Sequence, residues 1–238
     1  MPQIIGTRHE TNLHRQLKLG YAGRDGRTEV EIAGFVVDVV NADGKCIEVQ
    51  TCNFGQIRKK AKGLAELYGL KIVYPVTIAK YLEVFDAKGK RQSQRKSPRS
   101  GSIWDVFGVL IYAPELPLLP GLEIELALVD VAEERVSDGK GSWRRKGLSI
   151  RDRRLLALRE QICLSKPADY LRFVPFARNE EFTTGTLGER VGIRVELAKK
   201  TLYVLTKIGI VERIGKQGNA YVYRLLATSR TKKWKKKL

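Results

Sequence analysis

The segment Phe35–Gln50 (FVVDVVNADGKCIEVQ) places three side chains that could do chemistry on two expected strands. Asp38 stands among four valines, where a buried strand would otherwise be apolar on both faces. Glu48 and Gln50 alternate with apolar residues, so both side chains project from the same face of their strand. Carboxylate oxygens are ligands that Mg²⁺ and Mn²⁺ prefer, and these ions also bind phosphate groups. This pattern therefore indicates metal-assisted chemistry on a phosphate ester.

The register of the hairpin decides whether Asp38 lies next to Glu48. A loop of three residues that ends in a left-handed Gly44 sets the two acids directly opposite each other. A loop of two residues, Asp43 and Gly44, shifts the register by one and sends the acids to opposite faces. We favour the longer loop because it gathers the apolar residues on one side, namely Val37, Val39, Ile47 and Val49.

Two carboxylates opposite each other repel, so the predicted pair costs stability unless a cation lies between them. Lys45 projects from the other face of the hairpin, and the sequence places no other obvious cation beside the pair. We therefore predict that Asp38 and Glu48 bind Mg²⁺ or Mn²⁺. The alternative is an ordinary exposed hairpin face with both acids in solvent, which the valines around Asp38 disfavour.

Four features, in chain order, resemble the PD-(D/E)XK nuclease superfamily: a helix with Glu10, a strand with Asp38, the triplet Glu48-Val49-Gln50, and a basic helix. The resemblance covers about residues 5–80, or, in a wider interpretation, the strands to 134 as well. It implies the restriction endonuclease-like fold, a mixed α/β sheet flanked by helices. It implies a DNA endonuclease in which Asp38 and Glu48 bind the metal ion. Gln50 would position water or phosphate, and Glu10 would assist.

The sequence departs from the family pattern at two positions. Val37 stands where the motif has proline, a common variation, and Gln50 replaces the lysine of E-x-K. Some restriction enzymes of the superfamily use E-x-Q and remain active. In other members the lysine moves to the next helix, which makes Lys59 or Lys60 a possible substitute. Glu10 has a second interpretation, as a helix N-terminal acid favoured by the helix dipole.

Histidine and cysteine chemistry has little support in the sequence. The chain has two histidines, His9 and His14, and we interpret both as surface side chains or phosphate contacts. Its three cysteines form no CxxC motif, which is typical of a reducing compartment. We expect Cys46 and Cys52 to be buried and to bind no zinc.

Expected elements place these residues in a first domain, residues 1–136. We predict a helix over 7–19 ended by Gly20, two strands in the segment 29–52, and a helix over 56–68 ended by Gly69. Three more strands follow, at 70–78, 103–112 and 122–136. The polar segment 87–102 contains six basic residues and no acid, and we interpret it as a mobile loop, either a plain linker or a DNA contact.

The charge of the chain is strongly asymmetric. Its 238 residues include 44 Lys or Arg and 26 Asp or Glu, a formal charge of +18. Residues 1–134 hold 18 basic and 17 acidic side chains, or +1, and residues 135–238 hold the remaining 26 and 9, or +17. A charge of this size in one half of a chain is typical of a module that neutralises nucleic-acid phosphates.

The C-terminal half carries the pattern of a second domain. A basic connector, 137–154, precedes two predicted helices at 155–162 and 167–173. A capped helix at 182–192, a longer helix at 194–208 and a hairpin turning at 216–219 complete a pattern that resembles a winged helix-turn-helix domain over residues 155–227. The resemblance implies DNA contacts by Arg194, Lys199, Lys200 and Lys207 on the second helix and by Arg213, Lys216 and Gln217 on the wing. The alternative use of such a domain is protein contact. Residues 228–238 form a basic tail that we expect to be disordered.

Together these patterns predict an Mg²⁺-dependent deoxyribonuclease that acts on duplex or branched DNA. By analogy with other nucleases of this fold it would act as a homodimer. The competing hypothesis is a catalytically inactive DNA-binding protein, regulatory or architectural, and an RNA-directed protein is a third. No apolar run approaches the roughly 20 residues of a membrane span, and the N-terminus lacks a signal-peptide pattern. We expect a cytoplasmic, nucleoid-associated protein.

Overall fold

The computed structural model describes residues 11–226 of the chain. These residues form two compact units, and each is built from separate stretches of the chain. The sheet unit contains the described residues of 1–51, 72–103 and 125–162. The helical unit contains 52–71, 104–124 and the described residues of 163–238. The sequence suggested instead a first domain over 1–136, a connector over 137–154 and a second domain over 155–227.

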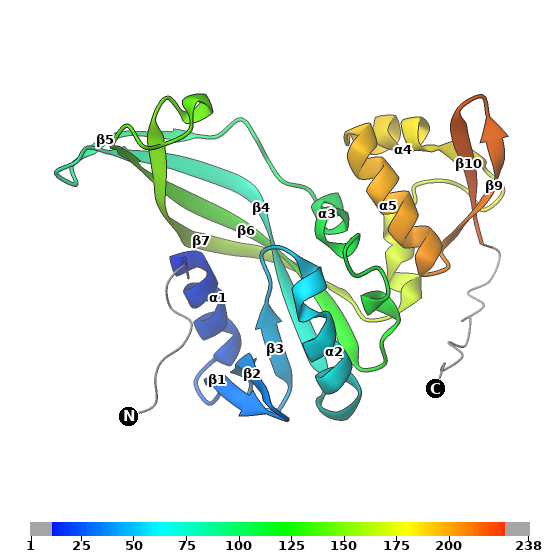
Figure 1. The fold of residues 1–238 in the computed structure, drawn as a ribbon, viewed down its shortest axis with the longest axis horizontal. Coiled ribbons are helices and arrows are strands. Elements are labelled where there is room, and N and C mark those ends of the chain that lie inside the picture. The colour runs from blue at the N-terminus through cyan, green and yellow to red at the C-terminus, as the bar shows by residue number, and fades with distance from the viewer. Residues whose placement is uncertain (1–10, 227–238) are drawn as a thin grey trace. The chain divides into compact units, whose positions relative to one another are not determined.

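The large sheet has the strand order β1-β2-β3-β4-β6-β7, with β5 paired to β4 (Figure 1). Its bounds are β1 Arg27–Ile32, β2 Phe35–Val40, β3 Cys46–Val49, β4 Leu70–Phe85, β5 Arg91–Lys96, β6 Leu122–Ser137 and β7 Leu148–Leu164. The first residues of β4 and β6 and the last of β7 belong to the helical unit. The chain is therefore a mixed α/β protein with a large sheet flanked by helices, as predicted.

The helical unit combines helices with a small sheet of order β8-β10-β9. Its helices are α2 Phe54–Tyr68, α3 Phe107–Leu110, α4 Thr184–Val191 and α5 Val195–Lys207, and its strands are β8 Phe182–Thr183, β9 Val211–Gln217 and β10 Ala220–Leu225. Short 3₁₀ segments are η1 Ile103–Val106, η2 Leu116–Leu118 and η4 Pro167–Phe173, and η3 Trp143–Arg145 lies in the sheet unit. Among the described residues, no helix combines the length and apolar content that crossing a membrane requires.

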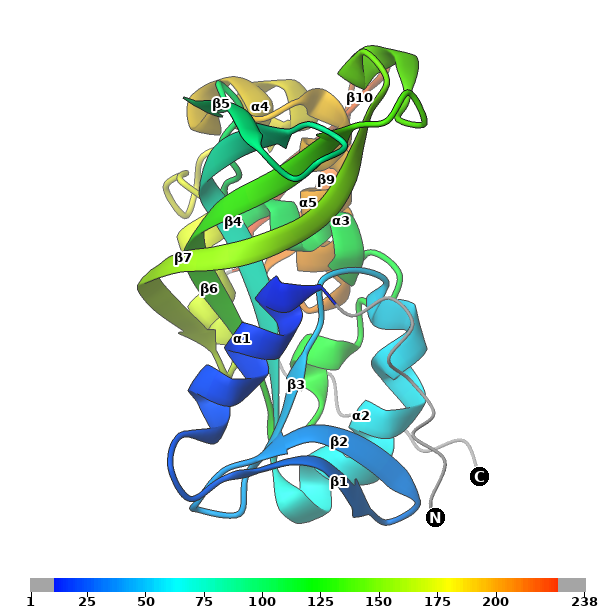
Figure 2. The same ribbon diagram turned by 90° about the vertical axis from the view of Figure 1, so that its left-hand side faces the viewer.

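Helix α1, Asn12–Ala22, lies across one face of the sheet (Figure 2). Its stripe of Leu13 and Leu17 packs into a core with Val39 and Ile47 of the hairpin and with residues of β4 and β6. Thr11 caps the helix, which passes through Gly20 and ends at Gly23, where φ is 64°. The predicted end at Gly20 was therefore wrong, because a glycine inside a well-packed helix costs only about 1 kcal/mol. Residues 7–10 of the predicted helix lie outside the described residues.

The hairpin between β2 and β3 has the register that the sequence favoured. Val39 pairs with Ile47 and Val40 with Cys46. The Asn41 N–H donates to the Lys45 carbonyl over 3.2 Å. Gly44, with φ of 78°, supplies the left-handed residue of the three-residue loop. The preceding apolar run is split by a second tight turn into β1 and β2, whose register pairs Ile32 with Phe35.

Four segments adopt a different structure from the one expected. The loop predicted at 87–102 contains β5, which pairs with β4 in antiparallel register, Tyr81 opposite Lys96. Residues 103–112, predicted as a strand, form η1 and α3, because Val106, Phe107 and Leu110 are buried at helical spacing. Residues 155–162, predicted as a helix, continue β7, and the predicted connector 137–154 consists of the end of β6, η3 and the start of β7.

The C-terminal elements follow the expected order of helix, helix and hairpin. Thr183 caps α4, which ends at Gly192 in the left-handed conformation, with φ of 68°. Helix α5 buries Ala198, Leu202 and Leu205, and the β9–β10 hairpin turns between Gln217 and Ala220, which pair with each other. The segment predicted as helix at 167–173 is the 3₁₀ helix η4. The predicted basic tail, 228–238, lies outside the described residues.

Candidate functional site

Three acidic residues occupy the same level of three neighbouring strands in the sheet unit. The β1–β2 register pairs Thr28 with Val39 and Val30 with Val37, which sets Glu29 between them opposite Asp38. The β2–β3 register, extended by one residue, sets Asp38 opposite Glu48. We call Glu29, Asp38 and Glu48 the acid row. The pairing of Asp38 with Glu48 is the one that the sequence predicted, and Glu29 is a member that sequence reasoning missed.

Asp38 and Glu48 are fixed by reciprocal hydrogen bonds between their two strands. The Asp38 backbone N–H donates to Glu48 Oε1 over 3.0 Å, and the Val49 N–H donates to Asp38 Oδ2 over 2.9 Å. Each carboxylate thus accepts a hydrogen bond from a backbone N–H of the partner strand. In a regular antiparallel ladder, a backbone carbonyl would accept that hydrogen bond. Glu48 is buried and Asp38 is partly exposed. The pair is therefore oriented by the backbone, and one member of it is accessible to solvent.

Helix α1 brings two further side chains to Asp38. The His14 Nε2 atom lies 3.6 Å from Asp38 Oδ2, and the Lys18 Nζ atom lies 3.9 Å from Asp38 Oδ1. His14 Nε2 is also 2.8 Å from the Val49 carbonyl, which can only accept, so this nitrogen carries a hydrogen. Lys18 is buried and also pairs with Glu29. The two residues are one helical turn apart, which is why both reach the same strand.

The structure places two residues of α1 differently from what the sequence suggested. The prediction that no cation lies beside the acids was wrong, because the Lys18 ammonium bridges Glu29 and Asp38. His14, which we interpreted as a surface side chain or a phosphate contact, is partly buried, with its ring against Val49 and Asp38. The sequence holds no local signal for this position, because Lys18 directly follows Leu17 and consecutive helix residues point about 100° apart, away from the stripe of Leu13 and Leu17.

The backbone at Glu29 is in the left-handed region, with φ of 53°. A residue with a β-carbon rarely adopts this conformation, and the cost is on the order of 1–3 kcal/mol. The surrounding pairs hold it there, because Thr28 and Val30 both keep their partners on β2. The strained residue lies directly beside Asp38, as strained residues at functional sites often do.

The other predicted site residues lie in different places. The Gln50 N–H donates to the Val73 carbonyl over 2.8 Å, which joins the end of β3 to β4. Glu10 and His9 lie outside the described residues. Lys59 and Lys60 lie on α2, in the helical unit. Cys46 is buried as expected, whereas Cys52 is exposed, contrary to the prediction.

The residues predicted to bind DNA lie on α5 and the hairpin of the helical unit. Arg194 precedes the first turn of α5 and is exposed, as is Lys199, while Lys200 is partly exposed. Lys207 lines an open cleft of about 440 Å³ with Arg58 and other residues.

On the hairpin, two cations flank one aromatic ring. Arg213 Cζ lies 4.2 Å from the centroid of the Tyr221 ring, and Lys216 Nζ lies 5.0 Å from it. Gln217 is exposed at the hairpin turn, where it pairs with Ala220. The hairpin therefore presents a cationic and aromatic surface.

Fold and site together define a mixed α/β protein with an acid row on three strands and a lysine from the helix that covers them. Residues 11–165 match a protein family described as "Domain of unknown function (DUF8091)", and the chain belongs to this family. The matched segment begins at α1 and ends just after β7, so it includes the entire acid row.

An "Uncharacterized protein" of Treponema pallidum (strain Nichols) is 35% identical over 152 residues. The match covers 64% of this chain and 61% of that protein, so this chain spans less than two thirds of the length of its relative. No solved structure matches the chain.

Proposed function

We propose that the chain is a metal-dependent DNA endonuclease whose active site is the acid row with Lys18 and His14. The observation that carries the proposal is the position of Asp38, which lies opposite Glu48 and within 3.9 Å of Lys18. The order of α1, the Asp38 strand, the Glu48 strand and the basic α2 is also the order on which the resemblance to the PD-(D/E)XK superfamily rests.

The charges of the acid row favour a bound divalent cation. Glu29, Asp38 and Glu48 carry three formal negative charges, and Lys18 carries one positive charge. The donor set also fits, because carboxylate oxygens are hard ligands of the kind that Mg²⁺ and Mn²⁺ prefer. Asp38 and Glu48 would hold the ion, as the resemblance implies. When bound, such an ion activates water and stabilises negative charge on a phosphate.

Lys18 takes over the role of the lysine that E-x-Q lacks. Its ammonium reaches Asp38 from α1 instead of from the Glu48 strand. There it would hold the phosphate near Asp38 and stabilise the charge that develops on its oxygens. His14 would orient Asp38, since its Nε2 atom lies beside both Asp38 Oδ2 and the Val49 carbonyl. Gln50 would position water or phosphate, and Glu10 would assist.

The helical unit would anchor the substrate. We propose that α4, α5 and the β9–β10 hairpin form a winged helix-turn-helix, with Arg194, Lys199 and Lys200 toward the major groove. The cationic hairpin supports a phosphate contact by the wing. Cleavage of both strands would require two active sites, which favours a homodimer. A DNA substrate also implies a cytoplasmic, nucleoid-associated location.

The proposal is tested with supercoiled plasmid and branched DNA in Mg²⁺ or Mn²⁺. The wild type should produce nicked and linear products, which EDTA should abolish, and Asp38→Asn should be inactive. Asp130→Asn is the matched control, because Asp130 is a buried carboxylate of the sheet unit that pairs with Arg159 outside the acid row.

The second candidate is a DNA-binding protein without catalytic activity, regulatory or architectural. Lys18 favours this alternative, because its ammonium already offsets part of the negative charge of the acid row and so reduces the need for a metal ion there. If the wild type binds duplex DNA but cleaves neither DNA nor RNA with Mg²⁺ or Mn²⁺, that result would support the DNA-binding protein and overturn the proposal of a nuclease. Cleavage of RNA alone would redirect the substrate to RNA.

A further inference from the structure

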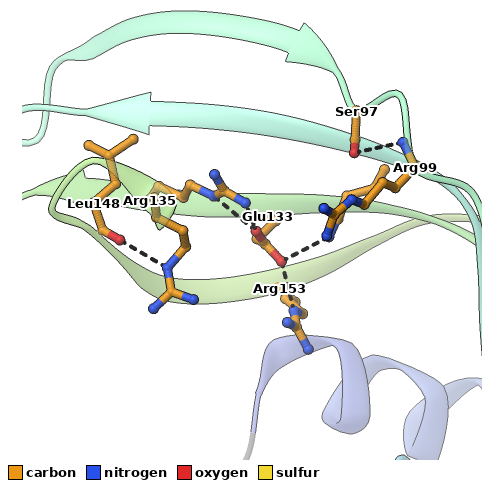
Figure 3. A network of polar contacts seen from close by, with 8 residues as sticks. Ser97, Arg99, Glu133, Arg135, Leu148 and Arg153 are labelled. Carbon is orange, nitrogen blue, oxygen red and sulfur yellow. Dashed lines mark hydrogen bonds and ion pairs between the residues drawn. The ribbon is translucent and has the colours of Figure 1, made fainter. Parts of the chain in front are cut away.

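A second charged cluster in the sheet unit is centred on Glu133 of β6. The Glu133 carboxylate is almost fully buried, with 1% of the side chain exposed. Arg135 donates to Oε1 from Nε and Nη2 over 2.9 and 2.6 Å. Arg153 donates from Nε to Oε2 over 3.2 Å, and Lys80 Nζ lies 3.5 Å from the same oxygen. Figure 3 shows Arg135 and Arg153 on two sides of the carboxylate. We call these four residues the Glu133 cluster.

The Glu133 cluster holds more positive charge than its carboxylate can neutralise. One buried acid faces three cations, so the cluster has a formal charge of +2. Its members differ in exposure: Arg135 is 15% exposed, Lys80 27% and Arg153 45%. Arg135 therefore serves mainly to satisfy the acid, and the surplus charge reaches solvent through Arg153 and Lys80.

Arg153 presents a guanidinium with donors still available. Its Nε is directed at Glu133, and within the described part of the chain its two terminal nitrogens have no acceptor at hydrogen-bonding distance. The bond to the buried acid fixes the side chain, which lowers the entropy cost of binding a second anion. A fixed guanidinium with free terminal donors matches the oxygens of a phosphate, which it can bind in bidentate fashion.

A neighbouring ion pair on the same strand shows that this arrangement is not a general property of the sheet. Asp130 is also buried, but it pairs with one arginine, Arg159, whose Nε and Nη2 both donate to Asp130 Oδ2. That pair is neutral. Glu83, a buried acid of β4, pairs with Arg91 and Arg154, so the surplus of cations is largest at the Glu133 cluster among these three acids.

Helix α1 connects the Glu133 cluster to the acid row. His14 lies beside Asp38, and two residues earlier Asn12 donates its backbone N–H to Asp152 Oδ1 over 3.0 Å. Asp152 directly precedes Arg153 on β7. The first part of α1 thus contacts Asp38 of the acid row and, on β7, the residue next to Arg153.

We propose that Arg153 and Lys80 of the Glu133 cluster bind a backbone phosphate of the nucleic acid next to the one that is cleaved. The inference rests on the proposed nuclease function, since it names a substrate-positioning site beside the acid row. The ligand is a phosphodiester of the DNA backbone, which carries no sequence information, so the site sets the position of the strand and not its sequence.

The test measures binding of the full-length protein to a fluorescein-labelled DNA duplex in EDTA, by anisotropy across a series of salt concentrations. Arg153→Gln should weaken binding on the order of tenfold and reduce the slope of log affinity against log salt by about 0.9. Lys80→Gln should reduce the slope similarly. Arg159→Gln, the matched control, also removes one partly exposed arginine that pairs with a buried acid, and it should change affinity less than about twofold.

The outcomes separate this site from the catalytic proposal, because binding in EDTA does not depend on cleavage. Reduced binding by Arg153→Gln, with an unchanged control and melting temperature, supports the phosphate site even in a protein that does not cut. The proposed phosphate site is overturned if Arg153→Gln and Lys80→Gln both bind DNA with wild-type affinity and wild-type salt dependence. This holds even if the wild type cleaves plasmid. An equal loss in Arg153→Gln and Arg159→Gln also overturns it, since the effect then reflects total charge.

Discussion

The Nζ atom of Lys18 lies 3.9 Å from Oδ1 of Asp38, although Lys18 comes from the helix and Asp38 from the second strand of the sheet. The same ammonium pairs with Glu29 of β1. One buried lysine therefore ties together the helix and two strands at the acid row. Its removal should affect stability, metal binding and activity in different ways, which makes it the most informative residue to change.

Lys18→Met keeps the length of the side chain and removes its charge. Without metal this variant should be less stable by about 3 kcal/mol, because breaking a buried ion pair leaves acids uncompensated. Mg²⁺ should then raise its melting temperature by more than it raises that of the wild type. Calorimetry of both proteins, with Mg²⁺ and with EDTA, makes the comparison. An unchanged melting temperature with Mg²⁺ in both proteins would show that the acid row binds no cation.

Lys18→Met also tests the replacement of the family lysine. If Lys18 stabilises charge on the phosphate, the variant should cut plasmid on the order of 10²- to 10³-fold more slowly, even at Mg²⁺ concentrations that restore its fold. Lys59→Met and Lys60→Met are the controls, since they change the two lysines that the sequence suggested. A loss of activity in either control, with full activity in Lys18→Met, would move the role to α2.

Gln50 can be tested by restoring the family residue. Gln50→Lys should fold normally and keep or raise cleavage, because the Gln50 backbone bond to Val73 does not depend on the side chain. Gln50→Ala should reduce cleavage on the order of 10²-fold, the effect typical of a positioning group. Equal rates for wild type and both variants would remove Gln50 from the site.

Glu29 affects stability both through its strained backbone and through its charge, and a comparison with Ala33, which has similar backbone strain and no charge, separates the two effects. Both residues have positive φ, 53° and 49°. Ala33→Gly should stabilise the protein by about 0.5–1 kcal/mol, since glycine adopts this conformation without strain. Glu29→Gly relieves the same strain but removes one of the two partners of Lys18, so it should stabilise less than Ala33→Gly or destabilise. Urea unfolding of the two variants would contradict this account if Glu29→Gly were the more stable.

The Glu133 cluster predicts part of the acid sensitivity. Burial raises the pKa of Glu133, but the hydrogen bond from Arg135 and the charges of Lys80 and Arg153 outweigh it and hold that pKa below its ordinary value of 4.5. The ionised carboxylate therefore adds stability above about pH 4.5, and this contribution is lost as the pH falls through the lower folded value. Between pH 7 and 3, Glu133→Gln should lose less stability than the wild type, as measured by thermal melting.

Local signals in the sequence account for the parts of the site that were predicted. The loop Ala42–Gly44 fixes the β2–β3 register by its own turn chemistry, so the pairing of Asp38 with Glu48 follows from a few adjacent residues. Lys18 and Glu29 reach the same place only when α1 packs on the sheet and β1 pairs with β2. Such contacts depend on tertiary packing, which local patterns do not encode.

Strand β7 shows the corresponding limit for the fold. Its segment Leu155–Ile162 is rich in leucine, alanine, arginine and glutamate, which all favour helix, yet it is a strand. Pairing with β6 determines the conformation of this segment, because the hydrogen bonds along that long strand outweigh the local helix propensity. The hairpin after β9 was predictable for the opposite reason, since Gly218 and Asn219 favour a tight turn themselves.

The interleaving of the two units has a consequence for synthesis on the ribosome. The sheet unit needs residues up to 162, and the helical unit joins 52–71 and 104–124 to the C-terminal third of the chain. Helix α3 packs on α5, which follows it by more than eighty residues. Neither unit can therefore fold completely until most of the chain has left the ribosome. The apolar surfaces of α2 and α3 are synthesised early and stay exposed until the C-terminal part of the helical unit has been made. Folding should accordingly be slow and largely post-translational, with a period of exposure in which chaperones can bind.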